Sequence, residues 1–195
     1  MTISTSATPR RRARPTQLPA YQVKITLLGT KPPVWRRLVV PGQWHLGRVH
    51  DVVQLAMGWT DSHLHQFEVG TRRIGVPDDG GWGEPPERET SVRLAEVLAA
   101  VGSSLDYEYD FGDGWRHRLV LEAELPHETT ARCLAGRRAC PPEDCGGPWG
   151  FQELLEALAD PRHERHEELR EWAGEHFAPA EFDLADTDAR LRSMT

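Results

Sequence analysis

The spacing of apolar residues changes several times along this chain, and that change constrains the fold more than any other sequence feature. Over 21–28 apolar and polar residues alternate, whereas over 46–57 the apolar residues recur every three or four positions. Alternation places side chains on the two faces of a strand, and the longer period places them along one side of a helix. The pattern therefore predicts a sheet with amphipathic helices packed on it.

The same criteria, applied along the chain, predict strands first, then helices and strands in alternation, and helices last. The expected strands cover 21–28, 34–40, 62–69, 105–111 and 115–125; the expected helices cover 46–57, 91–100 and 163–172, with another from residue 151 and a last one around 186–192. Gly58 is expected to cap the first helix and Ser91 to begin the second, while 78–88 is expected to be a loop. The order β-β-α-β-α-β-β followed by helices indicates an α+β domain. Its mixed sheet is covered by helices and resembles a β-grasp sheet with additions.

Length and composition favour one folded domain with an unfolded arm. The chain has 195 residues, enough for a single core, and seven tryptophans that bury large surfaces. Residues 1–20 have too little apolar surface to fold. We therefore expect a disordered arginine-rich tail over 1–20 and a single domain over 21–195.

The net charge of −7 at pH 7 hides a strong asymmetry. The tail carries +4, from Arg10, Arg11, Arg12 and Arg14, so the remaining residues carry −11, and the C-terminal helical segment is especially acidic. An acidic body binds a polyphosphate backbone poorly, so contact with nucleic acid is expected only through the tail. The chain has no apolar run that predicts a membrane span and no apolar signal segment at its N-terminus, which predicts a cytoplasmic protein.

All three cysteines lie within thirteen residues, at Cys133, Cys140 and Cys145. Their odd number argues against a secreted disulfide framework. Thiolates close together in turns can bind zinc, and a tetrahedral site needs a fourth ligand, for which we take His117. Other histidines near in sequence are His127, His163 and His166. Alternatively, the cysteines pack as small hydrophobes. The segment PPEDCGGP then only forms a loop, because it is too rich in proline and glycine for a helix or a central strand.

A second group of candidates surrounds the turn Gly112-Asp113-Gly114 between the last two expected strands. Asp110, Asp113 and His117 could bind a divalent ion or act as acid and base. Alternatively, the aspartates bond to the backbone of the turn. The letters Asp-Phe-Gly also occur in protein kinases, but the glycine-rich loop, the strand lysine and the His-Arg-Asp loop of a kinase are absent from the sequence.

Two histidines and four aromatic residues complete the candidates. His63 and His65, two residues apart in an expected strand, share a face where both could bind one metal, or they are partly exposed strand residues. The aromatic residues are expected to fill the core between the sheet and the C-terminal helices, with a ligand groove as the alternative; they are Trp59, Trp115, Trp149 and Phe151. The sequence contains no phosphate-binding loop, nucleophile elbow or dinucleotide fingerprint.

Four segments of the sequence carry a resemblance to a known family. They are YQVKITLLGTKPPVWRRLVVPG, MGWTDSHLHQFEVG, YDFGDGWRH and CLAGRRACPPEDCGGPWGFQELLEAL. In this order, over about 21–191, they resemble the bacterial family named after the third open reading frame of plasmid pRiA4b. The resemblance implies the family's fold and a mobile-element context, because members are often labelled TnpR-like resolvases or passengers of insertion elements. It also favours Cys133 and Cys140 as a ligand pair, since family members do not always have cysteine at the position of Cys145.

The resolvase label itself does not extend to this sequence. A serine recombinase resembling the known ones carries a nucleophilic serine early in its catalytic domain and a helix-turn-helix near its C-terminus. The first expected strand has no serine, and the C-terminal helices are acidic where DNA would lie. We therefore do not expect recombinase activity.

Three functional hypotheses follow. The leading one is a non-enzymatic cytoplasmic module, with or without a stabilising metal, that binds a protein or peptide through its sheet or an aromatic groove. The second is a metal-dependent hydrolase that uses His63, Asp110, Asp113 and His117 beside the cysteine loop. The third is a DNA-accessory protein that acts through the arginine tail. The first two require the cysteine segment and the aspartate turn to lie side by side, with the histidines at their border.

Overall fold

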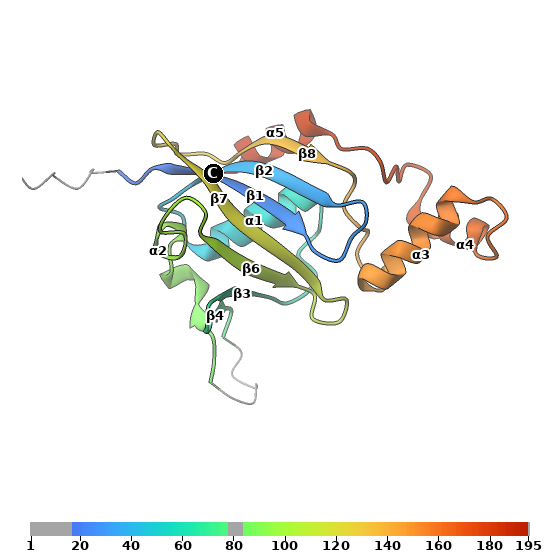
Figure 1. Cartoon of the computed structure of the whole chain (residues 1–195), viewed down its shortest axis with the longest axis horizontal. Helices are drawn as coiled ribbons and strands as arrows, with labels where there is room; N and C mark the ends of the chain where they lie inside the picture. The colour runs from blue at the N-terminus through green and yellow to red at the C-terminus, as the bar shows by residue number, and fades with distance from the viewer. Residues whose placement is uncertain (1–16, 78–83, 195) are drawn as a thin grey trace, which may run out of the picture.

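The computed structural model describes residues 17–77 and 84–194, and the described residues form one mixed sheet of eight strands (Figure 1). The strands are β1 (Ala20–Leu27), β2 (Val34–Pro41), β3 (His65–Val69), β4 (Arg72–Gly75), β5 (Glu87–Arg88), β6 (Ser104–Tyr109), β7 (Trp115–Leu125) and β8 (Arg132–Arg137). They lie in the order β5-β4-β3-β6-β7-β1-β2-β8. Neighbouring strands are antiparallel except β4 and β5, which are parallel. The expected α+β class and mixed sheet are confirmed.

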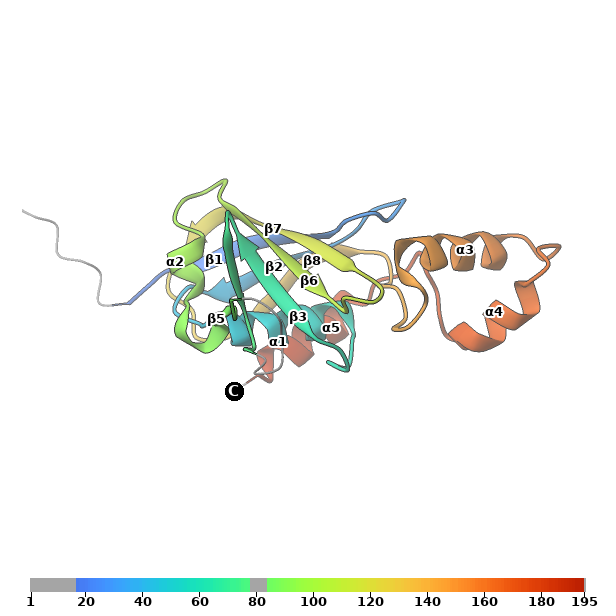
Figure 2. The same ribbon diagram turned by 90° about the horizontal axis from the view of Figure 1, so that it is seen from below.

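The helices fall into two groups. They are α1 (Leu46–Met57), α2 (Leu94–Val97), α3 (Gly147–Ala159), α4 (His166–Ala173) and α5 (Leu184–Arg192), with a 3-10 turn over Glu89–Ser91. Figure 2 shows α1 and α5 on one face of the sheet, whereas α3 and α4 pack against each other beyond the ends of its strands. None of these helices combines the length and the apolar character needed to span a bilayer.

Helix α1 is the element that the sequence predicts most completely. The His45 side chain accepts a hydrogen bond from the backbone N–H of Arg48 and so caps the first turn. At the other end Gly58 has φ 90°, the left-handed conformation that suits a glycine cap. The apolar stripe that includes Val49, Val52, Val53, Ala56 and Met57 is buried in the main core.

The sheet has one covered and one solvated face, as the alternation in the first strand predicts. Tyr21, Val23, Ile25 and Leu27 of β1 are buried, whereas the intervening residues are partly exposed. The solvated face carries ion pairs across strands, such as Arg118 with Asp106 and Arg37 with Glu122. Antiparallel sheets commonly have one face packed against the core and one face exposed to solvent.

Several expected boundaries are wrong. The helix expected over 91–100 is reduced to Leu94–Val97, and its N-cap is Arg93 and not Ser91. The reason is a backbone bridge between His45 and Arg93, which holds the chain extended before the helix. Strands β4, β5 and β8 were not expected, because they are short and lack clear alternation. Strand β3 begins at His65 and not at residue 62.

The C-terminal expectations also need correction. Helix α3 begins at Gly147 with Pro148 in its first turn, four residues earlier than expected, and α4 begins at His166 instead of 163. Among the C-terminal helices α5 contacts the sheet, whereas α3 and α4 project from it (Figure 2). Trp59, Trp115 and Phe151 are buried as expected, but Trp149 is 87% exposed. Its side chain lies on the projecting helix, away from the core.

Two expected segments fall partly outside the described residues. Of the tail expected over 1–20, residues 1–16, with all four arginines, lie outside, and so do residues 78–83 of the expected loop. Within the described part, the carbonyls of Leu18 and Pro19 accept hydrogen bonds from His127 Nδ1 and the Gly42 N–H. Residues 18 and 19 of the expected tail therefore already contact the folded part of the chain.

Leu121→Ala and Val120→Ala test the two-faced sheet on adjacent residues of β7. Leu121 is fully buried, so its truncation should lower the free energy of unfolding by about 2–5 kcal/mol. Val120 is half-buried on the solvated face, and its truncation should lower the free energy of unfolding by less than about 1 kcal/mol. Urea denaturation followed by circular dichroism measures both; equal losses would contradict a sheet covered on one face.

Candidate functional site

Three segments that are distant in sequence meet at one end of the sheet. They are residues 59–64 after α1, the β6–β7 turn at 110–114 and residues 139–147, which lead into the first residue of α3. We call them together the loop junction. The Asp110 N–H donates to the Leu64 carbonyl at 2.9 Å, and the Gly146 N–H donates to Asp113 Oδ2 at 3.2 Å. Trp59 Nε1 donates to the Pro141 carbonyl at 3.0 Å. The cysteine segment and the aspartate turn therefore lie side by side, with His63 at their border.

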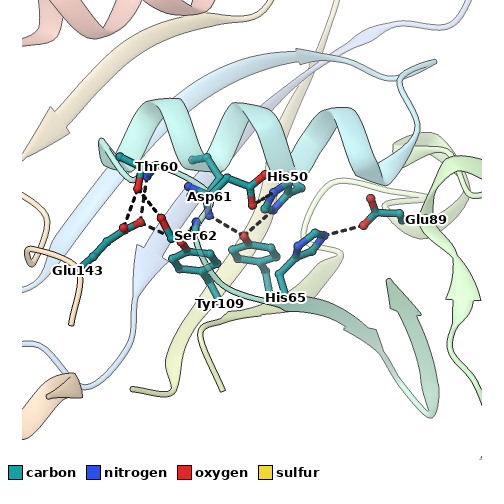
Figure 3. Close-up of polar contacts among 10 residues, drawn as sticks. His50, Thr60, Asp61, Ser62, His65, Glu89, Tyr109 and Glu143 are labelled. Carbon is teal, nitrogen blue, oxygen red and sulfur yellow. Dashed lines mark hydrogen bonds and ion pairs between the residues drawn. The ribbon is translucent and has the colours of Figure 1, made fainter. Parts of the chain in front are cut away.

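A carboxylate that the sequence analysis did not identify joins two sides of the loop junction (Figure 3). Glu143 accepts hydrogen bonds from the Thr60 N–H and hydroxyl at 2.9 and 2.7 Å, and from the Tyr109 hydroxyl at 2.8 Å. Burial by itself would raise the pKa of Glu143, but the hydrogen bonds from Thr60 and Tyr109 outweigh it and lower the pKa. The charged form therefore holds the segment before α3 against the end of α1. A glutamate after two prolines gives no sequence signal for this role.

His63 lies between two aspartates of the loop junction. Its Nε2 is 3.3 Å from Asp144 Oδ1 and 3.7 Å from Asp110 Oδ2. Asp110 Oδ1 accepts hydrogen bonds from the N–H groups of Gly112 and Asp113, which is the turn chemistry expected as the alternative. Only Oδ2 of Asp110 is therefore free to face His63. The sequence identified His63 and Asp110 as candidates but not Asp144.

A second histidine group lies between α1 and the sheet (Figure 3). His50 Nε2 is 2.9 Å from Asp61 Oδ1, His50 Nδ1 is 2.8 Å from the Tyr107 hydroxyl, and His65 Nε2 is 2.7 Å from Glu89 Oε2. The two imidazole rings stack at 3.5 Å, 9° from parallel. Burial, and then the neighbouring His65, lower the pKa of His50, so its neutral form is favoured. These hydrogen bonds account for a structural polar layer under α1.

The two strand histidines thus belong to different groups. His65 lies in β3 and packs against His50, whereas His63 precedes the strand and faces Asp110 and Asp144. The expectation that both meet one metal does not fit this arrangement, because the chain enters the strand only at His65.

His117 is a member of neither group. It is fully buried on β7, with its ring 5.3 Å from Trp59 and 5.4 Å from Tyr107. Burial lowers the pKa of His117 to about 4, because a charged imidazole would lose its hydration. His117 is therefore a neutral core residue.

The cysteines are not brought together with His117. Cys133 and Cys140 are buried near the Arg36 guanidinium, and Cys145 is half-buried beside Asp144. Burial raises the pKa of Cys133 to about 11 and that of Cys145 to about 12, and it also raises the pKa of Cys140. In the described part of the chain no group of three close ligand atoms includes a cysteine. Cys133 and Cys140 match the alternative, in which they pack as small hydrophobes.

A buried arginine, Arg36, lies beside this cysteine pair. Its guanidinium is buried, donates to the carbonyls of Ala56 and Arg137 at 2.9 and 3.1 Å, and stacks 3.9 Å from the centre of the Phe182 ring. A positive charge already occupies the space near both thiols. This charge would repel a second cation, but it also lowers the pKa of both thiols against the larger opposite effect of burial.

Large apolar side chains are exposed around the loop junction. Leu64 is 63% exposed, Phe111 is 53% exposed, and Trp149 in the first turn of α3 is the most exposed. Between α3 and α4 a cavity of about 260 Å³ is lined by Asp144, Cys145 and Trp172 among others. The junction therefore combines polar groups with an apolar rim.

Comparisons with known proteins place these features in context. A model of the plasmid pRiA4b ORF-3-like protein family matches residues 19–186, which include the whole loop junction. Uncharacterized protein y4hQ of Sinorhizobium fredii is 47% identical over 156 residues, which are 78% of this chain and 80% of that protein. The crystal structure of a protein of unknown function, MM3350 from Methanosarcina mazei Go1, superposes with a TM-score of 0.80 at 36% identity. The superposition covers 88% of this chain and 98% of that one.

Glu143→Ala tests the contact between the segment before α3 and the end of α1. It removes three hydrogen bonds and leaves the buried Tyr109 hydroxyl without this acceptor, so we expect a loss of about 1–3 kcal/mol in unfolding free energy. Hydrogen exchange of residues 139–147 should accelerate. Glu164→Ala, an exposed acidic residue on the projecting helical part, is the control and should change neither quantity. Unchanged exchange in Glu143→Ala would contradict this role.

His117→Leu tests the burial of a neutral histidine. The folded-state pKa is about 4 and the unfolded value about 6.5, so the unfolded chain binds the proton first as the pH falls. The contribution of His117 is complete above pH 6.5 and is lost as the pH falls towards 4. Between pH 7 and 4 the natural chain should therefore lose about 3 kcal/mol more stability than the variant, by urea denaturation. Parallel pH profiles would contradict the assignment.

Proposed function

This chain belongs to the plasmid pRiA4b ORF-3-like protein family. We propose that it is a binding module that recognises a basic, partly apolar segment of a partner protein. The names of the similar proteins state no reaction, so the proposal comes from the surface of this chain. The observation that carries it is the grouping of exposed Leu64, Phe111 and Trp149 on segments that are bonded to one another.

Single exposed apolar residues are ordinary in globular proteins, but a group of them on adjoining segments is typical of an interaction surface. Leu64 and Phe111 lie next to the hydrogen bond that the Asp110 N–H donates to the Leu64 carbonyl. Trp149 lies three residues after Gly146, whose N–H donates a hydrogen bond to the Asp113 carboxylate. The segments that carry these side chains are thus fixed before a partner arrives, which lowers the entropic cost of binding. Tryptophan is also the residue type most enriched among binding hot spots.

The charge of the surrounding surface indicates the kind of partner. Residues 147–173, which span α3 and α4, contain seven acidic and three basic residues. No residue of α4 is buried, and Figure 2 shows the two helices projecting from the body of the domain. An acidic arm beside an apolar rim complements a segment that combines lysine or arginine with aromatic or aliphatic residues.

The two other hypotheses have less support. The hydrolase needs His63, Asp110, Asp113 and His117 around one cleft, whereas His117 is buried in the core and the Asp113 carboxylate accepts a bond from Gly146. The DNA-accessory function depends on Arg10, Arg11, Arg12 and Arg14, which lie outside the described residues, and it stays a prediction. The TnpR-like, insertion-element association stays a prediction as well.

Selection from a phage-displayed library of random 16-residue peptides tests the proposal. The full chain should enrich peptides that combine basic with aromatic or aliphatic residues, and raised salt should weaken their binding. Trp149→Ala, at a nearly fully exposed position, should reduce the affinity for a selected peptide about tenfold or more by fluorescence anisotropy.

Val101→Ala is the matched control, because Val101 is 60% exposed but lies in the turn between α2 and β6, outside the loop junction. It should leave the affinity unchanged. The proposal is overturned if the chain enriches no peptide class over the starting library, or if the selected peptides bind Trp149→Ala as tightly as the natural chain.

A further inference from the structure

We propose that His63, Asp110 and Asp144 form a binding site for one divalent cation of the zinc type. This goes beyond the binding of a partner segment and does not depend on it. Among residues 17–77 and 84–194, two groups of three side chains place one ligand atom each within 4.8 Å of the others, and this is one of them. The other is the group of His50, Asp61 and His65.

The distances between the ligand atoms fit a metal ion. In a tetrahedral site with metal–ligand bonds of about 2.0–2.2 Å, the ligand atoms lie about 3.3–3.6 Å apart. His63 Nε2 is 3.3 Å from Asp144 Oδ1 and 3.7 Å from Asp110 Oδ2. The two aspartate oxygens lie within 4.8 Å of each other, so these atoms can close around one ion by a side-chain adjustment on the order of 1 Å.

The hydrogen bonds distinguish the two histidine groups. His63 Nε2 is buried and makes no hydrogen bond to any described residue, although Asp144 Oδ1 lies within ion-pair distance. A buried polar atom without a partner is costly, and a cation bound between His63 and the two carboxylates would supply the contact that Nε2 lacks. In the other group both nitrogens of His50 and Nε2 of His65 have hydrogen-bond partners. That group is complete without an ion.

The loop junction holds Asp110 and His63 in place, together with the residue that precedes Asp144. Asp110 Oδ1 is fixed by two backbone N–H groups, so that Oδ2 is directed at His63. The His63 ring packs edge-on against Tyr109 at 5.8 Å, and the Tyr109 hydroxyl is bonded to Glu143, the residue before Asp144. Outer partners of this kind orient metal ligands and raise affinity.

The ligand set also indicates the class of ion. One imidazole and two carboxylates favour a first-row ion such as Zn²⁺ over Mg²⁺ or Ca²⁺, which prefer sites made of oxygen alone. Two carboxylates balance the charge of a divalent ion. Three protein ligands leave one tetrahedral position open, and the 74% exposure of the Asp144 side chain places that opening at the surface.

Calorimetric titration with zinc chloride tests the site on the full chain, produced without a metal-affinity tag and dialysed against EDTA. We expect one ion per chain and weaker binding of Mg²⁺. Asp144→Asn should lower the affinity for zinc at least about tenfold. Asp144 has φ 58°, which asparagine tolerates, so the fold should be kept.

Asp61→Asn is the matched control, because Asp61 also has a left-handed φ, 57°, and belongs to the other histidine group. It should leave zinc affinity unchanged, while His63→Gln should lower it like Asp144→Asn. The proposal is overturned if the chain binds no zinc at millimolar concentration, if neither Asp144→Asn nor His63→Gln weakens binding, or if Asp61→Asn weakens it equally. Because no peptide is used, failure of peptide recognition does not affect this result.

Discussion

The close backbone contact between the start of α3 and the β6–β7 turn is the constraint on which the site depends. Gly147 has φ 67°, and a Cβ at this position would lie 2.4 Å from the Asp113 carbonyl oxygen. At Gly150 a Cβ would lie 1.8 Å from the Cys145 carbonyl oxygen. Both approaches require glycine, because the atoms in the way belong to the backbone and cannot rotate aside. The glycines of this segment therefore allow α3 to begin directly against the β6–β7 turn.

The two histidine groups show how similar side chains acquire different roles. Each contains a histidine and an aspartate with a left-handed backbone. Under α1 the nitrogens find hydroxyl and carboxylate partners, and the group works as a polar layer that fixes the helix on the sheet. At the loop junction the carboxylates approach His63 without making a hydrogen bond. The difference lies in the completeness of the hydrogen bonding, which only the folded geometry reveals.

The sequence predicts what depends on local periodicity and misses what depends on long-range contact. Helix α1 and its Gly58 cap follow from spacing alone, and so do β1 and β7. The exposure of Trp149 does not, because the same apolar pattern in α3 suits a helix on the core and a helix that projects from it. His63 and Asp110 can be proposed from the sequence as members of one site. Glu143 and Asp144 enter that site only because residues 139–147 fold back onto α1. The closeness of the cysteines in a turn-rich segment predicts thiolate ligands, yet it carries no information about the buried Arg36 beside them.

The two proposed properties of the loop junction are linked by charge. Asp110 and Asp144 contribute two negative charges next to the apolar rim, and these charges would attract a basic segment. A divalent cation bound to the same carboxylates neutralises them, so that it lowers the local attraction for lysine or arginine. Alternatively, its open coordination position can accept a donor atom from the partner, which strengthens binding. By thermodynamic linkage, the factor by which the ion changes the affinity for the partner equals the factor by which the partner changes the affinity for the ion.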